Sequence, residues 1–355
     1  MSAATAVGAL QTRALSQATL LRLTLGAAAL WEIGGHVDAW YHVHYGFQIE
    51  TFFTWAHALL YGAWALLGVL AVVGAAGERR LGQLRAGYPT LLLGAFLFGV
   101  GGPVDFAWHS LFGFEVRLET LLAPSHLWLT MSFAVAMFGV LQVTLLARTR
   151  GGASPSSNLA VMLALGLLLR VVLWDLWYSE PLSVDYASGG ALSRHLVGFT
   201  GIAWGSPAAD IAGVTGLVLH SVLLSLFLVA ALRRLRLPGG AVAVAMLWNG
   251  LLTATVTDKL PYLAAVALAA LVGEALWARV RAGRLGGPEG RVGYWLIGAG
   301  VPAVQFAGYF ALMGAVVGGV IWTTHLWTGA PFLAGFYGLI AALLAAPPRG
   351  LFADG

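Results

Sequence analysis

The chain has 355 residues, of which 59% are hydrophobic and only 10% are charged, and its mean hydropathy is +0.83. Soluble domains carry roughly 25% charged residues, so this chain lacks the charge to cover a water-exposed surface. Its net charge of +4 is not gathered on a soluble module with interleaved aromatic residues, which argues against nucleic acid as a partner and leaves the lipid bilayer.

Apolar stretches long enough to cross a bilayer recur along the whole chain. They lie at about residues 16–40, 51–76, 88–110, 119–147, 157–178, 208–232, 239–257, 261–282, 292–320 and 325–346. The sequence therefore predicts an all-α fold, a polytopic transmembrane helical bundle of about ten spans. The first span is too long for a cleavable signal peptide, and we expect it to act as a signal anchor.

Most arginines fall on one side of this ten-span topology, and the other side has few cations, namely Arg117, Arg194 and Lys259. The arginines of the first side are Arg13, Arg79, Arg80, Arg85, Arg148, Arg150, Arg233, Arg234, Arg236, Arg279, Arg281, Arg284, Arg291 and Arg349. Because short cytoplasmic loops are enriched in Lys and Arg, we expect both termini to be cytoplasmic. The predicted location is a bacterial inner or plasma membrane.

An internal repeat occupies the first four spans. Residues 34–57 read GGHVDAWYHVHYGFQIETFFTWAH, and residues 101–126 read GGPVDFAWHSLFGFEVRLETLLAPSH. Both copies contain GG-x-VD-x3-H-x3-GF followed by ET-x5-H, with two extra residues in the spacer of the second copy. Each copy covers the end of one span and the start of the next, so the duplicated unit is a helical hairpin.

The Gly/Ser/Pro-rich segment 151–156 predicts a linker. It separates a four-helix repeat domain, residues 1–150, from a six-helix transmembrane domain, residues 157–346. The second domain contains no copy of the motif. We expect the outer loop 179–207 to cover part of the outer face.

Each copy of the repeat supplies one carboxylate and two imidazoles in the same order. They are Asp38, His42 and His57 in the first copy, and Asp105, His109 and His126 in the second. Helical residues four apart share a face, so each Asp lies beside the first His of its copy. The second His is expected about two turns into the next helix, facing the outer end of the preceding one. Each hairpin is therefore predicted to bring three ligands together near the outer face.

Two His and one carboxylate with open coordination positions suit copper, iron or zinc, and the spacing alone does not choose among them. Cysteine is absent, which excludes thiolate ligands. The candidate partners that fix the imidazole tautomers are His36, His44, Glu50, Glu115 and Glu119. The alternative is a hydrogen-bonded Asp–His network that holds the four helices together without metal. Ionisable groups within membrane helices cost about 2.5–3.5 kcal/mol each, and their duplication favours metal binding.

Other polar residues lie at mid-span. Arg170, Glu32 and Glu274 suggest charge pairing between helices, for example Arg170 with Glu32. His220 is interpreted as a hydrogen-bonding core residue, with a third metal-ligand role as the alternative. The pair Asp258-Lys259 is interpreted as a solvated turn.

The second copy, Asp105-Phe-Ala-Trp108-His109 followed by Ala123-Pro124-Ser125-His126, resembles the C subunit of the copper membrane monooxygenases, the particulate methane and ammonia monooxygenase family. That subunit carries D-x-x-W-H followed by T-P-S-H, and a related second motif with Asn in place of Asp. The resemblance covers about residues 30–135. It implies copper ligands at both Asp-His-His sets, near the outer face.

This chain departs from the family pattern in several places. Both copies here have Asp, Thr54-Trp55-Ala56 stands where a Pro-Ser is expected, and the intervals between the paired His are longer. The family enzymes also need partner subunits, one with cupredoxin domains, and six further spans of this chain have no counterpart in the resemblance.

The leading hypothesis is a membrane-embedded, copper-dependent oxidoreductase, monooxygenase-like, that acts on a small apolar or lipid substrate. Additional membrane or cupredoxin-like subunits are the expected protein partners. One alternative is uptake, storage or delivery of copper or iron. Against transport, the chain contains only six Met and few mid-membrane polar residues. Another alternative is a non-catalytic subunit of a larger membrane complex.

Overall fold

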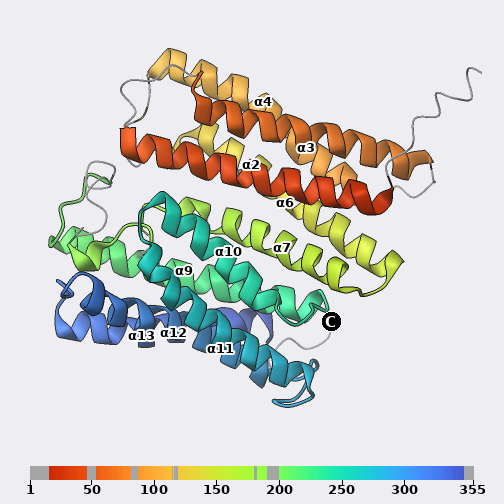
Figure 1. The fold of residues 1–355 in the computed structure, drawn as a ribbon. Coiled ribbons are helices and arrows are strands. Elements are labelled where there is room, and N and C mark those ends of the chain that lie inside the picture. Colours follow the sequence, from red (N-terminus) through yellow and green to blue (C-terminus); the bar gives the residue numbers. More distant parts are fainter. Residues whose placement is uncertain are drawn as a thin grey trace, which may run out of the picture.

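The computed structural model describes residues 16–45, 53–80, 87–113, 115, 119–179, 182–189 and 200–347. Within these residues every regular element is helical (Figure 1). Eight of the described helices are long and apolar enough to cross a membrane. The chain is therefore an all-α integral membrane protein.

The described chain contains ten long helices, and each coincides with one of the ten predicted apolar stretches. They are α2 (Gln17–Tyr45), α3 (Trp55–Arg80), α4 (Tyr88–Phe112), α6 (Pro124–Gly151), α7 (Pro155–Val172), α9 (Pro207–Arg234), α10 (Ala241–Val256), α11 (Leu263–Arg281), α12 (Val292–Val316) and α13 (Thr324–Ala345). Shorter elements are α5 (Glu119–Leu122), η2 (Trp174–Leu176), η3 (Tyr186–Ser188) and η5 (Leu260–Tyr262). The two long helices outside the group of eight are α2 and α10; α10 has only 16 residues.

The predicted linker is shorter in the structure than in the sequence analysis, because α6 continues to Gly151 and α7 begins at Pro155. A capping box starts α7. The Ser154 hydroxyl accepts from the Ser157 N–H at 3.2 Å, and the Ser157 hydroxyl accepts from the Ser154 N–H at 2.8 Å. These bonds satisfy N–H groups that the first helical turn leaves without a partner.

The helices form two groups that share a long contact (Figure 1). In one group, α2 packs against α3 and α4 packs against α6. In the other, α9, α12 and α13 pack together, and α10 and α11 join them to α7. The groups meet where α6 contacts α7 and where α2 contacts α7 and α10.

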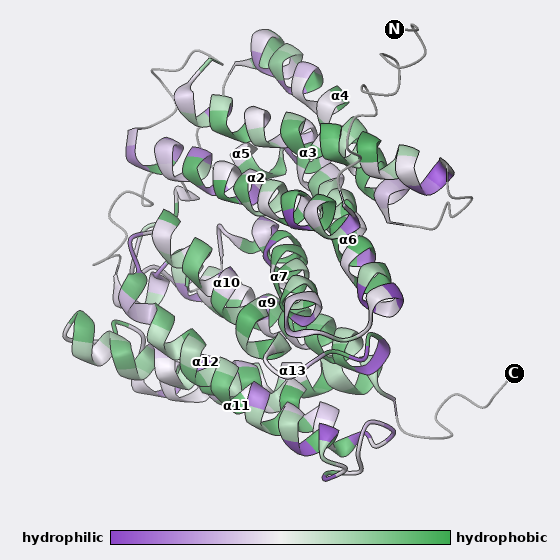
Figure 2. Ribbon diagram, turned by 45° about the vertical axis from the view of Figure 1, so that its right-hand side comes forward, coloured by the Kyte–Doolittle hydropathy of each residue, from purple (hydrophilic) through white to green (hydrophobic). Residues whose placement is uncertain are grey.

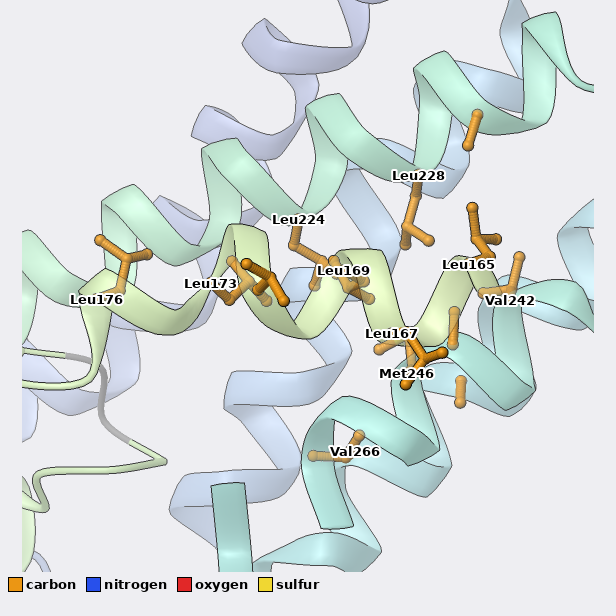
Figure 3. Close-up of a cluster of buried hydrophobic side chains, with 14 of the residues drawn as sticks. Leu165, Leu167, Leu169, Leu173, Leu176, Leu224, Leu228, Val242, Met246 and Val266 are labelled. Atoms are coloured by element: carbon orange, nitrogen blue, oxygen red, sulfur yellow. The ribbon is translucent and has the colours of Figure 1, made fainter. Parts of the chain in front are cut away.

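The centre of the second group is an apolar core around α7. Figure 3 shows Leu169 of α7 and Leu173, which directly follows this helix, beside Leu224 of α9, and Leu167 of α7 beside Met246 of α10; all five are nearly or fully buried. Fully burying a Leu side chain contributes about 1.5–3 kcal/mol. This packing fixes the end of α7 and therefore the segment that follows it.

The outward faces of the helices are also apolar. Leu66 and Val69 of α3, and Phe96 and Val100 of α4, are exposed. Figure 2 shows hydrophobic residues along the helices and hydrophilic residues mainly near their ends. This distribution matches a protein surrounded by hydrocarbon along its sides and by water at its two ends.

Candidate metal centre

The first set of ligand candidates lies where α2 ends and α3 begins. His42 Nε2 is 3.5 Å from Asp38 Oδ2, one turn earlier on α2. His57 Nε2, on α3, is 3.3 Å from Asp38 Oδ1. The ligand atoms of these three residues all lie within 4.8 Å of one another. We call this set triad 1.

The second set lies where α4 ends and α6 begins. His109 Nε2 is 3.4 Å and His126 Nε2 is 3.1 Å from the same atom, Asp105 Oδ1. These three residues also have ligand atoms within 4.8 Å of one another. We call this set triad 2. The structure thus brings together both sets that the sequence predicted.

The second His of each triad lies in the first turn of its helix, so the expectation of about two turns is wrong. The predicted spans began at residues 51 and 119, whereas α3 begins at Trp55 and α6 at Pro124. Thr54 Oγ1 accepts the His57 N–H at 3.0 Å and so caps α3. Pro124 is the first residue of α6. Proline favours the first helical position because its fixed backbone angle suits the helix and its missing N–H is not needed there.

The distances within each triad fit a bound ion. A tetrahedral ion with bonds of about 2.0–2.1 Å holds its ligand atoms roughly 3.3 Å apart. The imidazole Nε2 atoms lie 3.1–3.5 Å from the carboxylate oxygens. Asp38 Oδ1 and Asp105 Oδ1 are buried and accept no well-aligned hydrogen bond. A buried carboxylate oxygen is costly without a partner, so the donor set suits a cation at the point where the three atoms converge.

Both triads line one cavity of about 190 Å³. Its remaining wall is mostly apolar and includes Leu60, Tyr61, Phe98, Leu121, Leu129, Phe133, Trp174 and Trp177. Tyr61 lies between the triads: its phenol is within electrostatic reach of Asp38 and Asp105, and a Cβ on Gly102 would be 3.2 Å from its hydroxyl. The two triads therefore face a shared, mostly apolar space.

Polar partners hold the imidazoles of triad 2. His109 Nδ1 is 3.2 Å from Glu115 Oε2, and Trp108 Nε1 donates to Glu115 Oε1 at 2.8 Å. His126 Nδ1 donates to the Thr120 carbonyl. Carboxylates and carbonyls only accept, so Nδ1 carries the proton in both rings and Nε2 is directed toward Asp105. Glu115 is thus the one predicted outer partner that contacts a triad residue in the described part of the chain.

The other predicted outer partners have different places. His44 Nδ1 bonds the Trp40 carbonyl at 2.8 Å, and His44 Nε2 lies 2.7 Å from Asp258 Oδ2. His36 uses both ring nitrogens in a network with Arg170 and the Glu32 carbonyl. Glu50 and the side chain of Glu119 lie outside the described residues, as do Arg13, Arg85, Arg117, Arg194 and Arg349 of the topology argument.

Arg170 is fully buried beside the cavity. Its Nε donates to His36 Nε2 at 2.8 Å and its Nη1 to Asn249 Oδ1 at 3.1 Å, and the guanidinium lies 5.3 Å from the Trp174 ring. Glu32 Oε2 accepts from Trp248 Nε1 at 2.6 Å, and the positive charge of Arg170 acts on its carboxylate. Arg170 and Glu32, predicted as a pair, thus interact electrostatically, and their hydrogen bonds go to other side chains in a network that joins α2, α7 and α10.

Sequence reasoning missed two features. Trp174 and Trp177, which follow α7, line the cavity beside residues of the first four long helices. Nothing in the sequence indicated this, because both residues lie far along the chain from the two motifs. Lys259 is fully buried and donates to the Ser183 carbonyl at 2.6 Å. The prediction of a solvated turn at Asp258-Lys259 is therefore wrong for Lys259. His220 is a buried core residue 3.0 Å from Gln305 Nε2, and it lies in neither group of metal-ligand candidates.

The chain matches no family model, no curated protein and no solved structure.

Proposed function

We propose that this protein is a membrane-embedded, metal-dependent oxidoreductase, monooxygenase-like, that acts on a small apolar or lipid substrate. One observation supports this most: two Asp-His-His triads face a single cavity whose remaining wall is mainly apolar. Copper is the first choice of metal, from the motif resemblance, and iron or zinc also accept this ligand set.

The chain's own residues would bind the metal and exclude water. Asp38, His42 and His57 would hold one ion, and Asp105, His109 and His126 another, each with coordination positions left for a reactant. A bound redox metal would supply the electron transfer and oxygen chemistry. Phe98, Phe133, Trp174 and Trp177 would surround an apolar substrate and keep bulk water out.

The proposed topology has ten spans, with both termini in the cytoplasm of a bacterial cell and the triads near the outer face of its inner membrane. The arginine-rich ends of α3, α6, α9 and α11 support this orientation. Helix order alternates, so these ends lie opposite the ends of α2 and α4 that carry Asp38 and Asp105. Cupredoxin-like or other membrane subunits remain the expected source of electrons.

Metal handling is a weaker second candidate. Inward transport needs a path from the triads toward the cytoplasm. The residue beside the cavity on that route is Arg170, whose fixed positive charge opposes the passage of a cation. This placement favours chemistry or storage at the triads over transport past them.

The test is the metal content of the purified protein with and without the triad ligands. Wild type reconstituted with copper or iron should retain at least one equivalent per chain. His109→Ala with His126→Ala should bind less metal than wild type, because only triad 1 remains intact, while helical content and monodispersity stay unchanged. His325→Ala, an exposed His outside both triads, should bind as much metal as wild type. Loss of the fold in the triad variant would instead support a structural Asp–His network. X-ray absorption at the copper and iron edges identifies the metal.

A further inference from the structure

We propose that four aromatic side chains form the floor of the shared cavity and set how far an apolar substrate extends from the triads into the bundle. We call Trp31, Trp64, Phe98 and Phe133 the aromatic floor. The inference rests on the proposed function for the class of ligand, and it adds the residues that select among apolar substrates by length. The positions and contacts of these four side chains do not depend on a bound metal.

The aromatic floor is repeated in the sequence together with the ligands. Trp31 and Phe98 each lie seven residues before the Asp of their copy, and Trp64 and Phe133 each lie seven residues after its second His. Seven residues are close to two helical turns, so each aromatic side chain shares a helix face with a ligand. The helices that carry the Asp run toward the triads and those that carry the second His run away from them. The four aromatic residues are therefore expected at one level, about 10 Å from the ligands.

Ring contacts show that the four side chains form one layer. The ring centroids of Trp31 lie 4.8 Å from Phe98, in an edge-to-face arrangement, and 4.2 Å from Phe133. The Phe98 centroid also lies 6.5 Å from that of Phe133 and 6.2 Å from that of Trp64. Aromatic pairs at such distances attract one another in addition to burying apolar area. Phe98 is thus the member that contacts the other three, which come from α2, α3 and α6.

The cavity extends from the triads to this layer. Along α4 and α6 the lining residues farthest from the triads are Phe98 and Phe133. Trp31 and Trp64 pack against Phe98 from α2 and α3 without lining the cavity themselves. Two phenyl rings therefore bound the cavity at the end away from the triads, and two indole rings support them.

The support from α3 is fixed in place. Trp64 Nε1 donates to the Ala95 carbonyl of α4 at 2.7 Å. A Cβ on Gly99, one turn further along α4, would lie 2.5 Å from the Trp64 ring. The glycine thus leaves room for the indole, and the hydrogen bond holds the indole against α4. Phe98, which lies between these two positions in the sequence, is packed against a ring with a defined place.

A floor of this kind selects by chemistry and by length. Phenyl rings offer no hydrogen bonds, so a polar group against them would lose its hydration without compensation. The part of a substrate that points away from the metals is therefore expected to be apolar, such as an alkyl chain. In an apolar pocket one methylene more or less changes discrimination about 10–200-fold, so a ring that bounds the pocket determines which chain length fits.

The experiment measures which alkyl chains fit between the triads and the floor. Thr130 lines the cavity four residues after His126 and three before Phe133. The chain contains no cysteine, so Thr130→Cys places a single thiol in this space. The metal-free, full-length variant is treated with linear alkyl methanethiosulfonates from methyl to hexyl, which transfer an alkylthio group to the thiolate and release methanesulfinate. Intact-mass spectrometry gives the rates, and the hexyl reagent should react much more slowly than the methyl reagent.

A second step tests the floor itself. In the Thr130→Cys background, Phe98→Ala should raise the ratio of the hexyl rate to the methyl rate about 10-fold or more, because the space of the lost ring accepts the longer chain. Phe96→Ala is the matched control, since it is the same change on the same helix at a side chain that is 64% exposed. It should leave the ratio unchanged. Equal ratios in the two variants would overturn the inference.

Two further results keep the outcomes distinct. The unfolding temperature shows whether each variant is folded; if Phe98→Ala is not, the milder Phe133→Leu replaces it and should raise the ratio in the same direction. Loss of the fold in both variants would show that the layer is only a structural core, which also overturns the inference. Because the labelling uses metal-free protein, wild type that binds no metal would refute the proposed function alone. Equal ratios in a protein that does bind metal would refute the floor alone.

Discussion

At the scale of single residues, the buried guanidinium of Arg170 links three helices of the described part of the molecule. It is 1% exposed and bonds side chains from α2 and α10 while lying on α7. Glu32, also fully buried, is within electrostatic reach of the guanidinium. Buried charges are tolerated only when such partners are present, so these residues depend on one another.

Arg170→Met should therefore destabilise the protein strongly, by about 3–5 kcal/mol, because it leaves the Glu32 carboxylate buried without its countercharge. Adding Glu32→Gln to Arg170→Met should recover much of this loss. Denaturant unfolding in detergent measures both effects, and Arg279→Met, at an exposed arginine in the last turn of α11, is the control. A loss for Arg170→Met no larger than that control would show that the network does not stabilise the fold.

At the scale of helices, the geometry of triad 2 depends on how closely α4 and α6 approach. Gly94 of α4 lies against the backbone of Ala136, and Gly139 of α6 lies against the backbone of Leu91, with no room for a Cβ at either glycine. Small residues at such crossings allow membrane helices to pack by backbone contact. Asp105 and His109 extend from one of these helices and His126 from the other.

Gly139→Ala should push α4 and α6 apart, reduce stability and weaken metal binding at triad 2 more than at triad 1. Gly68→Ala on α3 is the matched control, because an added Cβ there meets nothing within 4 Å. Alanine is favoured over glycine within a helix by about 1 kcal/mol, so the control should be neutral or slightly stabilising. Thermal unfolding and Zn²⁺ titration together test the pair, and equal behaviour of the two variants would contradict the role of the crossing.

At the scale of the whole molecule, the ends of the bundle differ in charge. Arg148 at the end of α6 bonds the Arg236 carbonyl after α9 at 2.9 Å, and Arg233 bonds the Ala345 carbonyl of α13 at 2.9 Å. The opposite end contains the triads and the pair His44–Asp258, which joins α2 to the end of α10. This asymmetry supports the proposed orientation.

The absence of cysteine makes that orientation directly testable. A single cysteine at Ala203, before α9, should react with a membrane-impermeant thiol reagent added to intact cells, since this exposed residue lies at the triad end. A cysteine at Ser156, exposed at the start of α7, should react only after the membrane is permeabilised. The opposite labelling pattern would invert the topology.

Much of the architecture could be predicted from the sequence because it depends on local rules. Hydrophobic length located all ten long helices, although not their starts at Trp55 and Pro124, which capping and proline decide. Each triad was also predictable, since Asp38 with His42 lie one turn apart and His57 lies on the next helix of the same hairpin. Composition alone determined that the chain belongs in a membrane.

Only the tertiary structure decided what lies between the hairpins. In the tertiary structure both triads line one cavity together with Trp174 and Trp177, and Arg170 bonds His36, 134 positions earlier in the sequence. It also buried Lys259 against a segment 76 positions away. The physical reason is that hydrophobicity and helical spacing fix which face of a helix is polar, but contacts between helices far apart in sequence depend on how the side chains of the whole bundle fit together.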